Sequence, residues 1–150
     1  LNRSSLSLQY KNNGSYYLYD NSSYFCFPEN PLFKFEIYKK SLKGYYLDPE
    51  DGPLGFLSAK VESHGTEVYD ADASLLGTVT TKAVFDSNKR LKFKLHSNCC
   101  KYFVTNTEKK VVCDISTKAC MSDVYRFYNP CSNKDKCLII CLFMFHLRFE

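Results

Sequence analysis

Cysteine is the residue type with the most chemical potential in this 150-residue chain, and its placement is uneven. Seven of the eight cysteines fall in the last third, and the full set is Cys26, Cys99, Cys100, Cys113, Cys120, Cys131, Cys137 and Cys141. Zinc sites favour pairs of cysteines separated by two residues, and no such pair occurs here. The pattern therefore predicts structural disulfides and no metal site. An even number of cysteines in an oxidising compartment also leaves no obvious free thiol for nucleophilic catalysis.

Sequence spacing favours some disulfide pairings over others, although it does not fix the connectivity. Cys131 and Cys137 flank a short turn, and Cys113 and Cys120 bracket another short connection. Cys26 is alone in the N-terminal half, so we expect it to join that half to the cysteine-rich end. A bond that closes so long a loop would stabilise the fold by about 4 kcal/mol in the chain-entropy model.

Glycosylation motifs give a second indication of the compartment. Each of Asn2, Asn13 and Asn21 begins an Asn-x-Ser sequon. Attachment of a glycan to asparagine requires passage through a secretory lumen, and disulfides persist outside the reducing cytosol. The sequence starts at Leu1, which is expected if a signal peptide has been removed. The sequons and the cysteines together predict an extracellular, secreted protein.

Tyrosines gather in the same N-terminal stretch and form the candidate binding residues Tyr16, Tyr17, Tyr19 and Tyr24. Tyrosine offers a large contact area at low entropic cost and is enriched in recognition surfaces. It is also a favoured strand residue, so some of these rings could line the core instead. The sequence leaves these two interpretations equally open.

Other chemical signatures are missing or ambiguous. The three histidines, His64, His96 and His146, lie in no metal-ligand motif, and no nucleophile elbow or phosphate-binding glycine loop occurs. The net charge is +4, and Lys92 and Lys94 alternate with apolar residues, as on the solvated face of a strand. We therefore predict no enzyme activity, no cofactor and no nucleic-acid partner.

Alternation of apolar and polar residues is the main structural signal. It predicts strands at 33–38 and 91–96, and a last strand at 143–150 that packs against the core. Weaker strands are expected at 16–19, 44–47, 66–70, 75–85, 101–105, 110–115 and 124–128, and a single helical turn at 57–62. Turn residues such as Asn-Gly and Asp-Pro separate these runs. The predicted fold is a single domain, 1–150, that is mostly β: an antiparallel β-sandwich or barrel of hairpins, stapled by disulfides.

One segment resembles a known structural unit. Residues 66–79, which read Thr-Glu-Val-Tyr-Asp-Ala-Asp-Ala-Ser-Leu-Leu-Gly-Thr-Val, look like a hairpin of the tubby-like and scramblase-type β-barrels. That resemblance implies a barrel that ends in a buried apolar helix. The alternation at 143–150 predicts a strand there instead, and residence in the cytosol would conflict with the sequons. We therefore interpret the segment as a generic hairpin and assign no family.

These features favour a secreted, N-glycosylated recognition module that binds another protein. The alternative is a carrier of a hydrophobic small molecule or lipid in a barrel cavity, because phenylalanine recurs at alternating positions. The most apolar run, residues 137–145, is much shorter than the ~20 residues that a membrane-spanning helix needs. We therefore predict no transmembrane segment.

Overall fold

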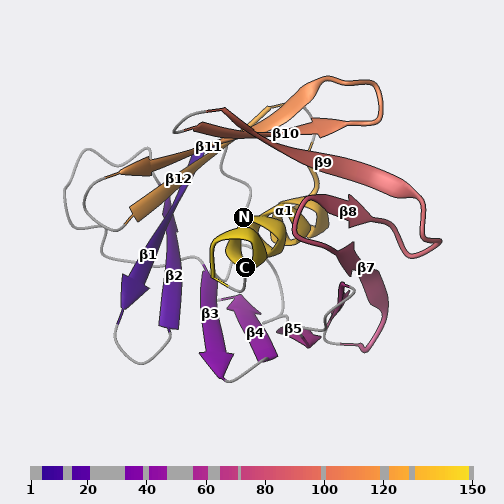
Figure 1. The fold of residues 1–150 in the computed structure, drawn as a ribbon. Coiled ribbons are helices and arrows are strands. Elements are labelled where there is room, and N and C mark those ends of the chain that lie inside the picture. Colours follow the sequence, from indigo (N-terminus) through magenta and orange to yellow (C-terminus); the bar gives the residue numbers. More distant parts are fainter. Residues whose placement is uncertain are drawn as a thin grey trace.

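The computed structural model describes residues 5–11, 15–20, 33–38, 41–46, 56–60, 65–70, 72–98, 101–118, 122–128 and 131–148. Its strands are β1 (Ser5–Lys11), β2 (Ser15–Asp20), β3 (Phe33–Tyr38), β4 (Ser41–Tyr46), β5 (Phe56–Lys60), β6 (Thr66–Tyr69), β7 (Leu75–Val79), β8 (Ala83–Phe85), β9 (Leu91–Asn98), β10 (Lys101–Asn106), β11 (Val111–Lys118) and β12 (Ser122–Phe127). One helix follows, α1 (Asn133–Arg148). The strands surround this helix (Figure 1).

The sheet is a closed antiparallel barrel in which each strand pairs with its neighbours in the sequence. Pairing of β1 with β12, in which Leu6 lies opposite Tyr125, closes the ring. Closure leaves no unpaired edge strand among the described strands, which removes the risk of edge-to-edge aggregation. The prediction of a mostly β, antiparallel chain of hairpins is confirmed, and of the two architectures considered the structure is the barrel.

Three hairpin turns share one design, which explains their tight geometry. In each, a side-chain oxygen accepts hydrogen bonds from two backbone N–H groups further along the turn, and the accepting residues are Asp70, Asp86 and Asn106. The third residue after each of these has a positive φ of 61–63°, and these residues are Ala73, Lys89 and Lys109. A turn followed by a left-handed residue shifts the strand register, and a bulge is found beside each turn.

The C-terminal segment corrects the sequence-based expectation of a strand at 143–150, because α1 extends to Arg148. Every residue from Cys137 to Met144 is buried, so the helix has no wet face there. A helix that is apolar on all sides shows no 3.6-residue period in its sequence. The alternation of residues at 143–150 therefore resembled that of a strand by chance. Its start is marked by Ser132, whose Oγ accepts a hydrogen bond from the backbone N–H of Asp135 at 3.1 Å.

A barrel with a buried apolar C-terminal helix is the arrangement that the resemblance of residues 66–79 implied. The strands of the barrel pack closely against this helix. A Cβ atom on Gly77 would lie 2.5 Å from the carbonyl oxygen of Phe85 and 3.4 Å from Leu138 of α1. On the other side, the rings of Tyr102 and Tyr125 meet Phe143 edge-on, with ring centroids 5.1 and 5.6 Å apart. The core is therefore formed between α1 and the inward side chains of the strands.

Two further expectations are corrected. The helical turn expected at 57–62 is wrong over the described part, because Phe56–Lys60 is strand β5 and pairs with β4 and β6. The single strand expected at 75–85 is interrupted between β7 and β8. There the Oγ1 of Thr80 accepts hydrogen bonds from the backbone N–H groups of Lys82 and Ala83, which stabilise a turn. In the described part of the chain, no helix is long and apolar enough to cross a membrane, as predicted.

Candidate functional site

The tyrosines predicted as a binding cluster do not form one surface. Tyr16 points into the barrel and is buried in the core. Tyr17 and Tyr19, which alternate with it, lie together on the other face of β2 with ring centroids 6.5 Å apart. Of these two, Tyr19 is only 7% exposed, and Tyr17 lies beneath the ammonium group of Lys34 at 5.7 Å. The predictions at Tyr24 and at the sequon residues, Asn2, Asn13 and Asn21, lie outside the described residues.

None of the described cysteines, Cys113, Cys131, Cys137 and Cys141, forms a disulfide. The predicted bonds between Cys131 and Cys137, and between Cys113 and Cys120, therefore have no support. The other four cysteines, Cys26, Cys99, Cys100 and Cys120, lie outside the described residues. Within the described ranges, no group of three or more His, Cys, Asp or Glu side chains could hold a metal ion.

Three of the described thiols, Cys113, Cys131 and Cys141, are poorly suited to nucleophilic chemistry. Burial raises the pKa of Cys113 and Cys141 well above the usual range. The pKa of Cys131 is raised to about 11, first by burial and then by the nearby carboxylate of Asp135. Lys136 and Lys92 oppose this shift without reversing it. Since the thiolate is the reactive form, these groups are largely inert near neutral pH.

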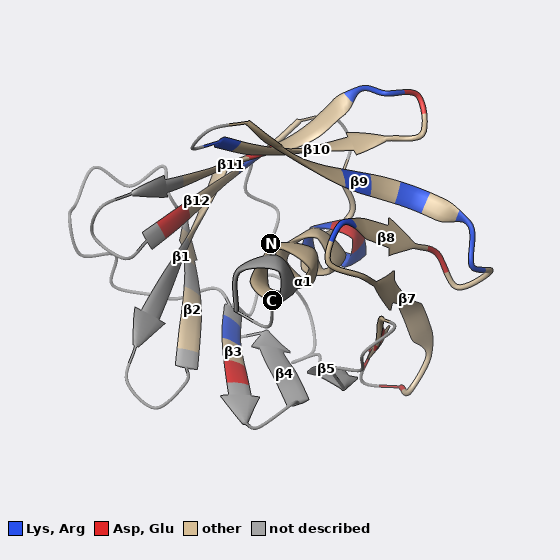
Figure 2. Ribbon diagram, viewed as in Figure 1, with Lys and Arg blue, Asp and Glu red and all other residues tan. Residues whose placement is uncertain are grey.

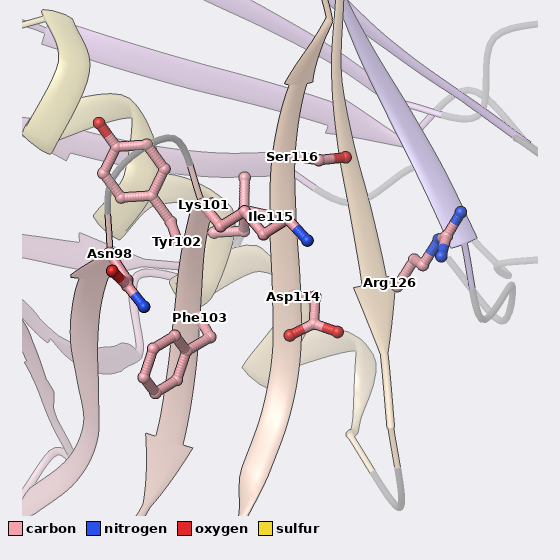
Figure 3. Close-up of a pocket in the computed structure, with 8 residues that line it drawn as sticks. All are labelled: Asn98, Lys101, Tyr102, Phe103, Asp114, Ile115, Ser116 and Arg126. Atoms are coloured by element: carbon pink, nitrogen blue, oxygen red, sulfur yellow. The ribbon is translucent and has the colours of Figure 1, made fainter.

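A different surface, the outer face of β9–β12, carries a row of half-buried and exposed side chains. Strand pairing aligns His96, Phe103, Asp114 and Arg126 in one row across the four strands. The adjacent residues Leu95, Val104, Ile115 and Tyr125 are buried in the core. Because side chains alternate between the two faces of a strand, the row that contains Phe103 points outward. Figure 3 shows Phe103 and Asp114 next to each other on neighbouring strands.

An aromatic pair lies on the first two strands of this face, β9 and β10. The rings of His96 and Phe103 stack with centroids 4.8 Å apart and an interplanar angle of 15°. The Nε2 atom of His96 is also 2.9 Å from the Oγ1 atom of Thr105 on the neighbouring strand. Both rings are half-buried. The stack is thus a fixed, partly exposed apolar platform with polar and charged side chains beside it.

Two shallow hollows meet at this platform. The first, of about 340 Å³, is lined by residues that include Lys101, Phe103, Asp114, Ser116 and Arg126 (Figure 3). The second, of about 320 Å³, is lined by residues that include Lys92, Lys94, His96, Phe103, Thr105 and Lys109. Phe103 lines both hollows, so one aromatic ring separates two adjoining depressions.

Positive charge is concentrated around the second hollow. Residues 80–116 contain eight basic and three acidic residues, whereas the rest of the chain has slightly more acids than bases. Figure 2 shows basic segments along β9, in the loop before it and in the turn after β10. The ammonium group of Lys92 lies 2.6 Å from Asp135, and that of Lys110 lies 3.5 Å from Glu108. Lys92 is therefore not only a solvated-face residue, as the alternation predicted, since it anchors the start of α1.

Asp114 is the only acidic residue among those that line the first hollow, and its carboxylate already accepts a hydrogen bond. Tyr128 donates a hydrogen bond from its hydroxyl to the carboxylate of Asp114 at 2.6 Å. Loss of that proton would break the bond beside a negative charge, which raises the pKa of Tyr128. Asp114 is thus held by Tyr128, whereas the lining of the second hollow contains three lysines and no acidic residue.

A solved structure shares this fold. The chain is similar to the X-ray structure of the Arabidopsis thaliana protein AT5G01750, with a TM-score of 0.64 and 18% sequence identity. The similarity covers 95% of this chain and 88% of the plant protein. No family model matches the sequence, and no curated protein matches it either. At this level of identity, the similarity shows the fold alone.

Proposed function

We propose that this protein is a non-catalytic recognition module that binds another protein through the outer face of β9–β12. The observation that carries the proposal is Phe103, an aromatic ring that lies on the solvent side of the sheet between two hollows. Protein interfaces concentrate their binding energy in a few aromatic or arginine anchors that are packed into pockets. The pairing of an aromatic platform with adjoining depressions is suited to this mode of binding.

The scaffold also supports this role. Phe103 lies on a strand hydrogen-bonded on both sides, to β9 and β11, so its position needs little ordering when a partner binds. Pre-organised contact groups reduce the entropic cost of association. By contrast, the outward-facing Tyr19 on β2 is almost completely buried, so that part of the outer surface offers less contact area.

Carriage of an apolar molecule inside the barrel receives no support from the described interior. Helix α1 occupies the place where such a ligand would bind, and its residues Ile139 and Ile140 are fully buried. Export and glycosylation stay predictions from the sequons. An intact-mass measurement after expression in a secretory host tests them, since each attached glycan adds mass that a glycosidase removes.

A peptide-display experiment tests the binding function. A library of random short peptides is panned on the folded protein, and the affinity of enriched peptides is then measured for single variants. We expect Phe103→Thr to weaken binding by about tenfold or more, because it removes the central aromatic anchor. Threonine is suitable as a replacement because it is favoured in strands.

Val111→Thr provides the matched control. Val111 is an exposed apolar side chain on the adjoining strand, with 42% of its surface accessible, and it lines neither hollow. We expect this variant to bind with unchanged affinity. The proposal is wrong if panning enriches no peptide, or if Phe103→Thr and Val111→Thr bind the enriched peptides equally well.

A further inference from the structure

We infer that the segment bound by this face is acidic, and that its carboxylates contact Lys94 and Lys109 beside the stack of His96 and Phe103. The inference rests on the proposed function and adds the chemistry of the partner. It concerns the second hollow, whose lining contains three lysines and no acid.

The two lysines approach the platform from different elements. Lys94 lies on β9, where its Cα partner across the sheet is Thr105. Lys109 lies in the turn between β10 and β11, where its backbone N–H donates to the carbonyl of Asn106 at 3.0 Å. The side chain of Asn106 also accepts hydrogen bonds from the N–H groups of Glu108 and Lys110. This network fixes the turn, so Lys109 is held at the edge of the hollow.

The charges of these two lysines are not balanced by the part of the chain that the structure describes. Lys92 and Lys110 each have a carboxylate partner, Asp135 and Glu108. Within the described ranges, neither Lys94 nor Lys109 forms an ion pair, and both are exposed. A partner that brings two carboxylates would therefore meet cations that need not first break an existing ion pair. Electrostatic complementarity of this kind sets specificity and association rate.

The shape of the site favours a short acidic peptide over other anions. A duplex or RNA footprint needs several aligned phosphate contacts, whereas Asp86, Glu108 and Asp114 interrupt the positive charge of residues 80–116. Adsorption to a membrane would call for exposed apolar side chains that enter the interface. The second hollow offers instead an aromatic platform about the size of one side chain, with cations at its border. An acidic segment that carries one aromatic or apolar residue matches this arrangement.

The test uses the peptides obtained by panning on the folded, full-length chain. We expect enriched sequences to contain several Asp or Glu residues around an aromatic residue. Lys94→Ala combined with Lys109→Ala should weaken their binding by about 5- to 30-fold, the upper part of the range expected for two exposed ion pairs. The loss should become smaller as salt rises from about 0.05 M to about 0.5 M.

A second double variant separates a site from general charge attraction. Lys89→Ala combined with Lys110→Ala makes the same change in net charge, at exposed positions that do not line the hollow. We expect it to change affinity by less than about threefold. Synthetic copies of the enriched peptides with Asn and Gln in place of Asp and Glu should bind the native protein as weakly as the acidic peptides bind the first double variant.

The outcomes distinguish the two proposals. If Phe103→Thr abolishes binding while Lys94→Ala/Lys109→Ala does not, the face binds proteins but the acidic partner is wrong. If neither affects binding, both proposals are wrong. Equal losses for the two double variants would also overturn the acidic site. The acidic-peptide site would also be wrong if a phosphatidylserine vesicle or a single-stranded RNA bound more tightly than any enriched peptide and its binding required the same two lysines.

Discussion

Cys131 shows how the local environment determines whether a residue can react. It lies just before α1, half-buried, and packs against the core. Burial and the carboxylate of Asp135 disfavour a second negative charge, so the pKa of the thiol rises to about 11. The fold thus suppresses a reactivity that the residue type alone would suggest. The positive charges of Lys92 and Lys136 lower the pKa of Cys131 but do not reverse its rise. Lys92 also forms an ion pair with Asp135.

This environment predicts slow alkylation of Cys131. At pH 8 we expect iodoacetamide to modify it roughly 10- to 100-fold more slowly than an unperturbed cysteine, because little thiolate is present. As the pH rises from about 8 to about 10, still below the pKa, its rate should increase about tenfold per pH unit. Peptide mapping by mass spectrometry gives the rate for this one residue. The same chain in urea is the control, and labelling at the urea rate under native conditions, or a disulfide at Cys131, would contradict the account.

At the same scale, the sequence contains enough information to place Phe103 on the solvent side of its strand, but not to show whether the tyrosines are buried. In residues 101–105, Lys101 and Thr105 mark the solvent side of the strand, and Phe103 lies on that same side. An aromatic ring in a polar column is a visible signal of an exposed anchor. For Tyr16 and Tyr19, alternation shows only that they face opposite ways, whereas both are buried because both faces of β2 are covered there.

At the scale of elements, the packing of β7 against α1 depends on one glycine. Gly77 sits where the carbonyl oxygen of Phe85 and the side chain of Leu138 leave no room for a Cβ atom. The clash at 2.5 Å is with backbone, which cannot be relieved by a change of rotamer. The strand must therefore shift away from β8 if a larger residue is introduced.

Gly77→Ala should accordingly lower the free energy of unfolding by at least about 2 kcal/mol, measured by urea denaturation with circular dichroism. Thr78→Ala is the matched control, because the neighbouring side chain is half-exposed and its loss should cost less than about 1 kcal/mol. Equal midpoints for Gly77→Ala and the native protein would show that β7 does not pack as described.

Elements differ in how visible they are in the sequence. The half-buried strands 33–38 and 91–96 were predictable because one face is wet and the other dry. Helix α1 was not, because residues such as Ile139 and Cys141 are buried whichever way they point. Its clearest signal was the start, where Ser132 is followed three residues later by Asp135, a pattern typical of a helix N-terminus. The same residues also fit a turn between Cys131 and Cys137.

At the scale of the whole molecule, closure of the barrel decides which surfaces are available. Local hairpins are compatible with both a sandwich and a barrel, and the choice is made by the pairing of β1 with β12, which are far apart in the sequence. Alternation alone contains no information on that pairing. Among the described residues, α1 packs against the inward side chains of the closed barrel, whereas the two hollows beside Phe103 lie on the outer face.

The distribution of charge has the same origin. The excess of lysine and arginine lies in residues 80–116, which form the consecutive strands β8 to β11. Because the barrel is a meander, residues close in sequence remain neighbours on its surface, and a basic segment becomes a basic face. The sequence therefore contains the excess of basic residues, whereas the ion pairs of Lys92 and Lys110, which distinguish them from Lys94 and Lys109, are visible only in the folded chain.

The most direct test of the central claim is a map of the binding surface by nuclear magnetic resonance. The 15N-labelled chain is titrated with an enriched peptide, and the amide shifts are followed residue by residue. We predict that the largest changes fall on residues 94–105 and on Lys109, around the platform formed by His96 and Phe103. Changes concentrated on Tyr16 to Tyr19 of β2 instead, or on α1, would contradict recognition through the outer face of β9–β12.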